Sequence, residues 1–344
     1  MMNPKVSFIV PCYNLAHLLP DCIESILAQS YGDFEVLIMD DCSPDGTPEV
    51  AQSFRDSRVQ HRRNRTNLGN IQNYNKGIGL ARGEHIWLIS ADDRLRRPYI
   101  LDRYVALMDR HPEVGYAFCP AVAIDESGRE TKFLNFSSLG EQDKVLRGHE
   151  FLKRLLRSDV VVAASGMARK ECYDRLGYFP LDLPYSGDWY LWSLFAMHYD
   201  VAYFAEPMVN YRQHTLSMTS SLVNRDINIC IANEITTLQR LEKKADAAGH
   251  TSLANLCHAE LVARRIREGD QAHWRRDFSH ALEHYRLALT LNPWMLGTWA
   301  KYLLLRTGRV GVYLRESRFG IRRLAHAIGS RHDPRHGAAS RQVP

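Results

Sequence analysis

The stretch HIWLISADDRLRR, residues 85–97, opens with a short apolar run and closes with two adjacent carboxylates and three arginines. A continuous apolar run is typical of a strand in a parallel sheet, because helices cover both faces of such a sheet. Asp92 and Asp93 directly follow this run. Two like charges side by side at a strand end suit either a turn that caps the next helix or a site where a divalent cation holds a phosphate.

Two earlier segments repeat the pattern of an apolar run that ends in polar residues. Residues 5–10 lead to Tyr13–Asn14, and residues 34–39 lead to Asp40–Asp41. Between these apolar runs lie segments whose apolar residues recur at helical spacing. The alternation of strands and helices predicts βαβ units and an α/β fold with a mostly parallel sheet and helices on both faces. Ligands of open α/β sheets bind beyond the carboxyl ends of the strands. Three polar strand ends therefore predict a site along one edge of the sheet.

Composition and length are those of a globular protein with one large domain and an appendage: 344 residues, 45% of them hydrophobic, and a net charge of +5 (44 Lys and Arg against 39 Asp and Glu). No apolar stretch approaches the roughly 18 to 20 residues that span a bilayer, and the N-terminus shows no signal-peptide pattern. The seven cysteines are scattered without a C-x-x-C pair. This spacing argues against a disulfide framework and a zinc site, and predicts a cytoplasmic location.

The chain is predicted to divide at residues 222 and 308. From about residue 158, a strand, an aromatic-rich helix and further strands are expected to complete the first domain, 1–222. Residues 223–308 have helical texture, and residues 275–294 resemble one tetratricopeptide hairpin, either single or part of an array. Residues 309–344 read as a basic amphipathic helix and a disordered tail. That helix could lie on an anionic membrane surface or pack on the helical region, and no recognition fold supports nucleic-acid binding.

Other polar residues each allow a structural and a functional interpretation. Asp40 and Asp41 are either turn formers or acceptors for a base or ribose. Asp188, in PYSGDWYLW, is either an N-cap or a general base whose pKa rises beside apolar tryptophans. His214 is either structural or, together with Arg212, part of a phosphate contact.

Five blocks together resemble one known family: VSFIVPCYN, SILAQSYGDFEVLIMDDCSPDGT, NLGN…NKGIGLARGEHIWLISADD, GDWYLW and YRQH. Their order, over about residues 5–222, resembles the family 2 glycosyltransferases with the GT-A fold. The resemblance implies inverting transfer of a sugar from a nucleotide-diphosphate donor, with UDP favoured, to a hydroxyl of a glycan or lipid-linked acceptor. It also implies a role in bacterial surface polysaccharide or glycoconjugate synthesis, in the cytoplasm or at the inner face of the cytoplasmic membrane.

The resemblance also assigns roles to particular residues. The residues that would bind the nucleotide sugar are Pro11, Tyr13, Asn14, Asp41, Asn67 and Asp92. The residues that would hold Mn²⁺ or Mg²⁺ are Asp92, Asp93 and His214. Asp188 corresponds to the catalytic base, which would take the proton of the attacking acceptor hydroxyl while the metal stabilises the departing diphosphate.

Four positions depart from the family pattern. Ser90 replaces an acidic residue at the start of the acidic strand end, Cys42 replaces a glycine, Tyr74 replaces an arginine, and Gly187 replaces an acidic residue before the base. Two other functions are considered. A sugar nucleotidyltransferase would carry a Gly-rich basic loop after the first strand, which PCYNLAHLL lacks. A non-catalytic nucleotide-sugar-binding or assembly protein would use the helical region for docking.

Overall fold

The computed structural model describes residues 3–135, 139–214 and 227–308. Contacts divide the chain into two compact units, Met1–Glu260 and Leu261–Pro344. The predicted basic helix and tail at 309–344 lie outside the described residues.

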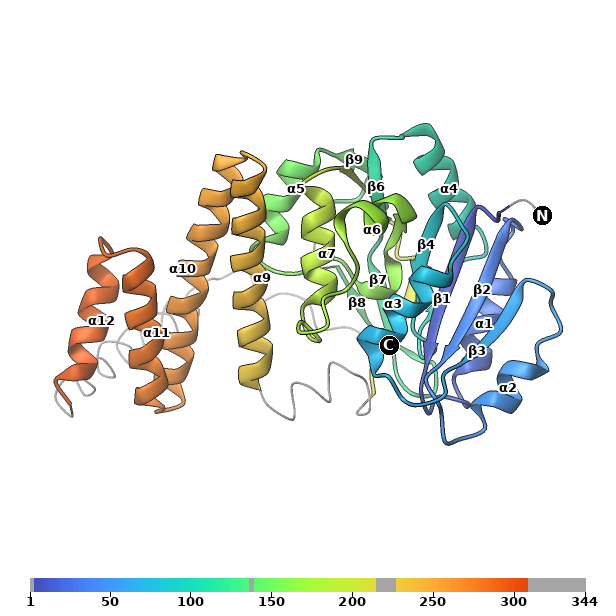
Figure 1. Ribbon diagram of the computed structural model, residues 1–344, viewed down its shortest axis with the longest axis horizontal. Helices are drawn as coiled ribbons and strands as arrows, with labels where there is room; N and C mark the ends of the chain where they lie inside the picture. Colours follow the sequence, from blue (N-terminus) through green and yellow to red (C-terminus); the bar gives the residue numbers. More distant parts are fainter. Residues whose placement is uncertain (1–2, 136–138, 215–226, 309–344) are drawn as a thin grey trace, which may run out of the picture. The chain divides into compact units, whose positions relative to one another are not determined.

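Two sheets form the centre of the first unit (Figure 1). The main sheet has the spatial order β3 (Val59–Arg63), β2 (Phe34–Asp40), β1 (Val6–Cys12), β4 (His85–Leu88), β10 (Met167–Arg169), β6 (Val114–Phe118), β11 (Asp200–Tyr203) and β9 (Lys144–Leu146). The smaller sheet has the order β5 (Arg94–Leu95), β12 (Val209–Arg212), β7 (Ala121–Ile124) and β8 (Glu130–Leu134). Strands β3, β2, β1 and β4 run parallel, whereas β10 is antiparallel to β4 and β6. The main sheet is therefore mixed and mostly parallel, which confirms the predicted α/β fold.

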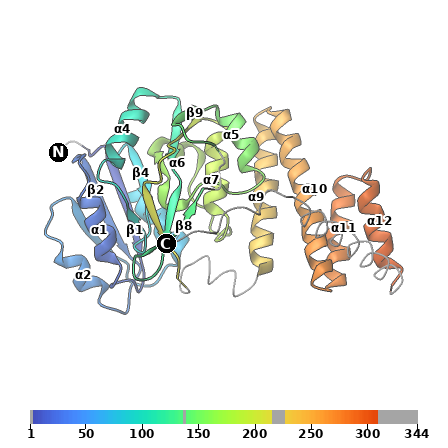
Figure 2. The same cartoon turned by 180° about the vertical axis from the view of Figure 1, so that it is seen from behind.

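Helices cover both faces of the main sheet. They are α1 (Leu19–Leu27), α2 (Thr47–Ser53), α3 (Asn70–Leu80), α4 (Ile100–Arg110), α5 (Gly148–Leu155), α6 (Lys170–Leu176) and α7 (Gly187–Ala196). Phe8 of β1 faces the core that α1 and α4 share, and its neighbour Ile9 faces α3. Figures 1 and 2 show α3 and α1 on opposite sides of the strands. A Cβ atom at Gly77 would lie 2.4 Å from Ile9 Cγ2, so glycine lets α3 pack closely. Every residue of β1 is buried, as its apolar run predicted.

The ends of the central strands meet at one edge of the sheet. The amide of Asp41 donates to the carbonyl of Cys12 (2.9 Å), and the amide of Ala91 donates to the carbonyl of Pro11 (3.2 Å). These bonds join the residues that follow β2 and β4 to the end of β1. The predicted convergence of three strand ends is confirmed, although β1 continues two residues further than its apolar run suggested.

The strand predicted from residue 158 is wrong in its position. Only Met167–Arg169 pair in the sheet, as β10, while Ala163–Ser165 form a 3-10 turn. Residues 160–162 are nevertheless buried, because they pack beneath the neighbouring elements as an irregular segment. A run of valines reports burial, and here burial occurs without strand pairing.

Helix α9 (Ile227–Ala247) packs against α7 within the first unit. The amide of Tyr185 donates to Asn233 Oδ1 (3.0 Å), and the hydroxyls of Ser186 and Thr237 lie 2.8 Å apart. The first unit therefore continues past residue 222, where the sequence predicts a boundary.

Helix α10 (Thr251–Trp274) crosses the border of the two units, and α11 (Phe278–Leu291) and α12 (Leu296–Arg306) belong to the second. The stretch 275–294 contains one helix, α11, whose buried Tyr285 packs with Ala272 of α10 and Leu305 of α12. The hairpin partner of α11 thus lies after the predicted repeat, in α12.

No helix among the described residues is long and apolar enough to cross a membrane. All seven cysteines are free thiols.

Cys42 adopts the left-handed backbone conformation, with φ = 62°, directly after Asp41. A side chain with a Cβ is strained there, and glycine is the residue that tolerates this region without cost. The glycine that the family resemblance implies at this position therefore has a structural reason. Asn14 is also left-handed, with φ = 57°, but asparagine tolerates this conformation better.

We predict that Cys42→Gly raises the free energy of unfolding by about 0.5–1 kcal/mol, since the relieved strain exceeds the extra entropy of glycine in the unfolded chain. Asn14→Gly is the control and should change stability less. Urea unfolding of both variants checks this. A loss of stability in Cys42→Gly would show that the contacts of the thiol outweigh the strain.

Candidate functional site

Three of the predicted acidic residues line one pocket of about 140 Å³ in the first unit: Asp92, Asp93 and Asp188. The first two follow β4 and the third lies in the first turn of α7, nearly a hundred residues later. The other lining residues are Ile71, Tyr74, Leu88, Ser90, Ala163, Ala164, Tyr173, Phe179, Pro184, Tyr185, Gly187, Trp192 and Tyr211. The pocket therefore combines three carboxyl groups with aromatic walls, and among the described residues no lysine or arginine lines it.

Asp92 forms an ion pair with His214, whose Nε2 lies 2.8 Å from Asp92 Oδ2. Burial acts to raise the pKa of Asp92, but hydrogen bonds from His214 and Ser90 hold that pKa below its ordinary value. The same contact raises the pKa of His214. Ser90, which departs from the family pattern, thus supports the charge of Asp92 instead of adding a third carboxylate.

Asp93 is almost fully buried, and its Oδ1 accepts a hydrogen bond from the main-chain amide of Arg212 (2.8 Å). Burial, together with the charge of neighbouring Asp92, raises the pKa of Asp93 well above its ordinary value. Two adjacent carboxyls cannot both stay charged cheaply in a buried site, so their pKa values move apart. A cation bound between them would let both ionise.

Arg212 stabilises the turn that contains Asp92 and Asp93, and its side chain is only 2% exposed. Its guanidinium donates to the carbonyls of Asp92, Asp125 and Glu126 (2.8, 3.0 and 3.0 Å). It also pairs with Asp21 of α1 at 2.7 Å. The prediction that Arg212 contacts a phosphate is therefore wrong, because this buried guanidinium is already committed to the protein.

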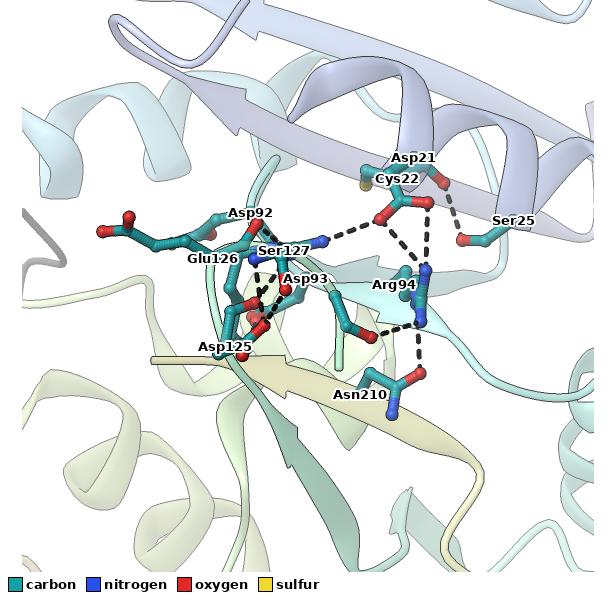
Figure 3. Close-up of polar contacts among 12 residues, drawn as sticks. Asp21, Cys22, Ser25, Asp92, Asp93, Arg94, Asp125, Glu126, Ser127 and Asn210 are labelled. Carbon is teal, nitrogen blue, oxygen red and sulfur yellow. Dashed lines mark hydrogen bonds and ion pairs between the residues drawn. The ribbon is translucent and has the colours of Figure 1, made fainter. Parts of the chain in front are cut away.

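The three arginines after the acidic pair do not neutralise it. Arg94 contacts both carboxylate oxygens of Asp21 (3.1 Å each) and donates to Asn210 Oδ1 (3.1 Å), as Figure 3 shows. Arg96 pairs with Glu130 and Arg97 pairs with Glu206. Asp21 thereby joins α1 to both Arg94 and Arg212, and Arg94, Arg96 and Arg97 each pair with an acid other than Asp92 and Asp93.

Asp188 is the second residue of α7 and not its N-cap, which is Ser186. Its Oδ1 accepts the hydrogen bond of the Trp189 amide (2.8 Å). Burial raises the pKa of Asp188. A second carboxyl, Asp159, lies close enough for the charge of Asp188 to act on it, so burial and that charge raise the pKa of Asp159 well above its ordinary value. Burial therefore raises the pKa of both carboxyls, and each disfavours ionisation of the other.

Of the residues predicted to bind the nucleotide sugar, Asp92 lines the pocket. The others do not line it: they lie at the ends of β1 and β2 (Pro11, Tyr13, Asn14 and Asp41) or between β3 and α3 (Asn67). The buried carboxylate of Asp41 accepts hydrogen bonds from Asn64 Nδ2 (2.8 Å), the Leu68 amide (2.8 Å) and the Gly69 amide (2.9 Å), so it shapes the loop before α3. Asn67 is exposed, and its Oδ1 accepts from the same Gly69 amide (2.9 Å).

Two further residues of this group lie where β1 ends. Tyr13 is 44% exposed, and the amide of Asn14 donates to Ser43 Oγ (3.2 Å). An exposed aromatic ring beside a strand end is a surface on which a base can stack. Pro11 belongs to β1 itself and contributes its carbonyl to the Ala91 bond.

The residues predicted as metal ligands fit a hard divalent cation in their chemistry. Asp92 Oδ1 is buried and has no hydrogen-bond partner among the described residues, which leaves an acceptor for a ligand. Two carboxylates and an imidazole suit Mn²⁺ or Mg²⁺. His214 already contacts Asp92, although it does not line the pocket.

Within the described ranges, three ligand atoms come within 4.8 Å of one another only at Glu84, His85 and Asp109, where β4 begins. Lys5 Nζ lies 2.6 Å from each of the two carboxylates there. The ammonium already compensates their charge, so this cluster is a surface ion-pair network.

Sequence reasoning missed Asp159 and the clamp of Asp21 and Arg94. Asp159 precedes a valine run that was taken for a strand, so its carboxyl was not considered part of the site. Asp21 lies on the exposed edge of α1 and carries no pattern that distinguishes it from an ordinary surface acid. Its role is revealed by its ion pairs with Arg94 of β5 and Arg212 of β12.

Residues 7–176 match the model of the family described as Glycosyl transferase family 2. Among curated relatives, glycosyltransferase GlyG of Streptococcus pneumoniae is 32% identical over 115 residues, which cover 33% of this chain and 38% of that protein. The chain therefore aligns with less than two thirds of this relative.

Two solved structures show the fold. TarS 1-349 of S. aureus, in complex with UDP-GlcNAc, has a TM-score of 0.62 and 17% identity, and the match covers 90% of this chain and 88% of that one. The mannosyltransferase PcManGT of Pyrobaculum calidifontis, in complex with GDP-Man and Mn²⁺, has a TM-score of 0.51 and 19% identity, with 88% of each chain covered. The fold is that of the GT-A glycosyltransferases, and the chain belongs to glycosyl transferase family 2.

Proposed function

We propose that the protein is a metal-dependent inverting glycosyltransferase that moves a sugar from a nucleotide-diphosphate donor to an acceptor hydroxyl. The observation that carries the proposal is the single pocket that joins Asp92 and Asp93 to Asp188. A site for the diphosphate and a base for the acceptor are the two parts that such a reaction needs, and they come here from separate parts of the chain.

Asp188 acts as the general base. Its burial raises its pKa and so strengthens it as a proton acceptor, while the Trp189 amide holds the carboxylate in place. Asp188 takes the proton of the acceptor hydroxyl as the oxygen attacks the anomeric carbon, and the bond from that carbon to the diphosphate breaks. Attack from the side opposite the leaving group inverts the configuration.

Asp92, Asp93 and His214 are the residues that would hold the cation, and Asp92 would also contact the nucleotide sugar. A bound Mn²⁺ or Mg²⁺ would supply charge neutralisation for the departing diphosphate. The Arg212 amide and guanidinium keep the Asp92–Asp93 turn in position for this role. The Mn²⁺ in the PcManGT complex supports a divalent ion in this fold.

The donor is proposed to be a UDP-sugar, whose base would lie beside Tyr13, Asn14, Asp41 and Asn67. UDP-GlcNAc in the TarS complex supports this assignment, while the GDP-Man complex of PcManGT makes GDP-sugars the comparison to include. The acceptor is a glycan or lipid-linked hydroxyl in bacterial surface polysaccharide or glycoconjugate synthesis. The proposed location is the cytoplasm, with the predicted basic helix of residues 309–344 contacting the inner face of the membrane.

A thermal-shift screen of nucleotide sugars with Mn²⁺, repeated with chelator, tests the donor assignment directly. A true donor stabilises the fold by mass action. The UDP-sugars should raise the melting temperature with Mn²⁺ present, and stabilisation by GDP-sugars alone would refute the UDP assignment.

Asp188→Asn should lower turnover by about 10²–10⁴-fold, since an amide cannot accept the proton. The fold should persist, because the amide oxygen can still accept the Trp189 hydrogen bond. Asp159→Asn is the matched control and should retain turnover within about tenfold, because Asp188 lines the pocket and Asp159 does not. Donor turnover and melting temperature measure both effects. Loss of turnover in Asp159→Asn with retention in Asp188→Asn would reverse the assignment.

The pH profile of kcat/KM provides a separate check. Asp188 works in its ionised form, and burial raises its pKa above the ordinary 3.8. Activity should therefore fall as the pH decreases through that raised pKa, at a higher pH than an exposed aspartate would give. An acid limb near 3.8 would contradict a buried base.

Asp93→Asn should abolish the stimulation of turnover by Mn²⁺ while leaving the melting temperature unchanged or higher. A neutral side chain removes the cost of a second buried charge, and its amide oxygen can still accept the Arg212 amide. Chelator should likewise abolish the Mn²⁺-stimulated turnover of the wild type. Full Mn²⁺-stimulated turnover in Asp93→Asn would remove Asp93 from the metal site.

A further inference from the structure

The wall of the pocket contains a buried hydrogen-bond donor without a partner. Trp192 is 4% exposed, and its Nε1 meets no acceptor among the described residues. Two other buried indoles are satisfied: Trp189 Nε1 donates to the Leu155 carbonyl (2.6 Å) and Trp87 Nε1 donates to the Ala164 carbonyl (2.9 Å). Buried indole N–H groups usually find a partner, so the unpaired one that lines a pocket points to a ligand.

Trp192 lies one helical turn after Asp188, and both residues line the pocket. Residues four apart on a helix share a face and are separated by about 6 Å along its axis. This spacing matches the width of one sugar ring. A ligand whose hydroxyl meets Asp188 would therefore bring a second oxygen to Trp192. In the proposed reaction Asp188 faces the acceptor, whereas Asp92 and Asp93 face the diphosphate. A group that contacts Trp192, on the same face of α7 as Asp188, therefore belongs to the acceptor.

The character of the pocket restricts the charge of that acceptor. The ionisable side chains that line it, apart from tyrosines, are Asp92, Asp93 and Asp188, and the described part of the chain adds no lysine or arginine to them. When no divalent cation is bound, an anionic acceptor meets repulsion from the ionised carboxylates. The aromatic side chains Tyr74, Tyr173, Phe179, Tyr185, Trp192 and Tyr211 instead offer flat apolar surfaces. Such walls suit the C–H faces of an uncharged sugar, with a few polar groups to fix its orientation.

We infer that Trp192 is a specificity-determining residue whose indole N–H donates to a hydroxyl oxygen of the acceptor, and that this acceptor group is an uncharged sugar ring. The inference rests on the proposed function for the identity of Asp188 as the base. It adds the chemical class of the acceptor, which neither the family nor the relatives specify. It also gives the unpaired indole a partner.

Binding of model sugars tests the inference without turnover. Methyl hexopyranosides and their 6-phosphates are titrated by saturation-transfer NMR in chelator, with no donor present. The wild type should bind at least one neutral glycoside and bind its 6-phosphate at least about tenfold more weakly. Trp192→Phe keeps an aromatic wall but removes the N–H, so affinity should fall about tenfold, the value of one hydrogen bond. Its melting temperature should fall less than that of Trp189→Phe, because both variants lose the same ring volume but only Trp189→Phe also loses a hydrogen bond within the protein.

Trp189→Phe is the matched control. It removes an indole N–H that bonds within the protein, so it should lower the melting temperature and leave glycoside affinity unchanged. Equal affinity of wild type and Trp192→Phe would overturn the role of Trp192. A 6-phosphate that binds as tightly as the glycoside, or a wild type that binds none of the glycosides, would overturn the acceptor class.

The proposed function is tested by a separate measurement, the turnover of nucleotide sugars in the presence of Mn²⁺. Glycoside binding that depends on Trp192, without any turnover of nucleotide sugars, would identify a sugar-binding pocket in a protein that lacks transferase activity. Turnover without glycoside binding would leave the enzyme assignment intact and remove the inferred acceptor.

Discussion

The hydrogen bonds of Arg212 are the interaction on which the candidate site depends. The main-chain amide donates a hydrogen bond to Asp93 and so offsets part of the free-energy cost of burying its carboxyl group. The guanidinium donates to the carbonyl of Asp92 and to the carboxylate of Asp21 on α1. One residue of β12 therefore ties the smaller sheet, the end of β4 and the first helix together. Removing such a buried charge would leave its partners unpaired, which is among the most costly changes that a protein interior can undergo.

Charged side chains are distributed unevenly around Arg212. Arg94, Arg96 and Arg97 pair with carboxylates elsewhere, so the acidic pair is compensated in part by His214 beside Asp92 and by the charge of Arg212 near Asp93. Desolvation and mutual repulsion move their pKa values apart, and the hydrogen bonds of His214 and Ser90 lower the pKa of Asp92 while burial raises that of Asp93. A pocket of this kind favours a positively charged occupant. A divalent cation and the positive charge that develops at an anomeric carbon both fit it.

Strand positions and the convergence of three strand ends could be predicted from the sequence, because continuous apolar runs report burial on both faces and parallel strands share one edge. The meeting of Asp188 with the acidic pair was expected only from the family resemblance. The run after Asp159 could not be assigned correctly, since apolar composition does not distinguish a paired strand from a buried irregular segment. Arg212 was misread for a related reason: an arginine near a histidine suggests a phosphate site until its burial is known.

The sequence by itself determined the α/β class, the acidic strand end and the aromatic start of α7, because these follow from local composition and periodicity. The tertiary structure alone decided which arginine pairs with which acid, that Asp159 faces Asp188, and that the Trp192 indole is unpaired at the pocket wall. Those features depend on contacts between residues distant in sequence, and the strength of each interaction depends on burial, which only the packed chain defines.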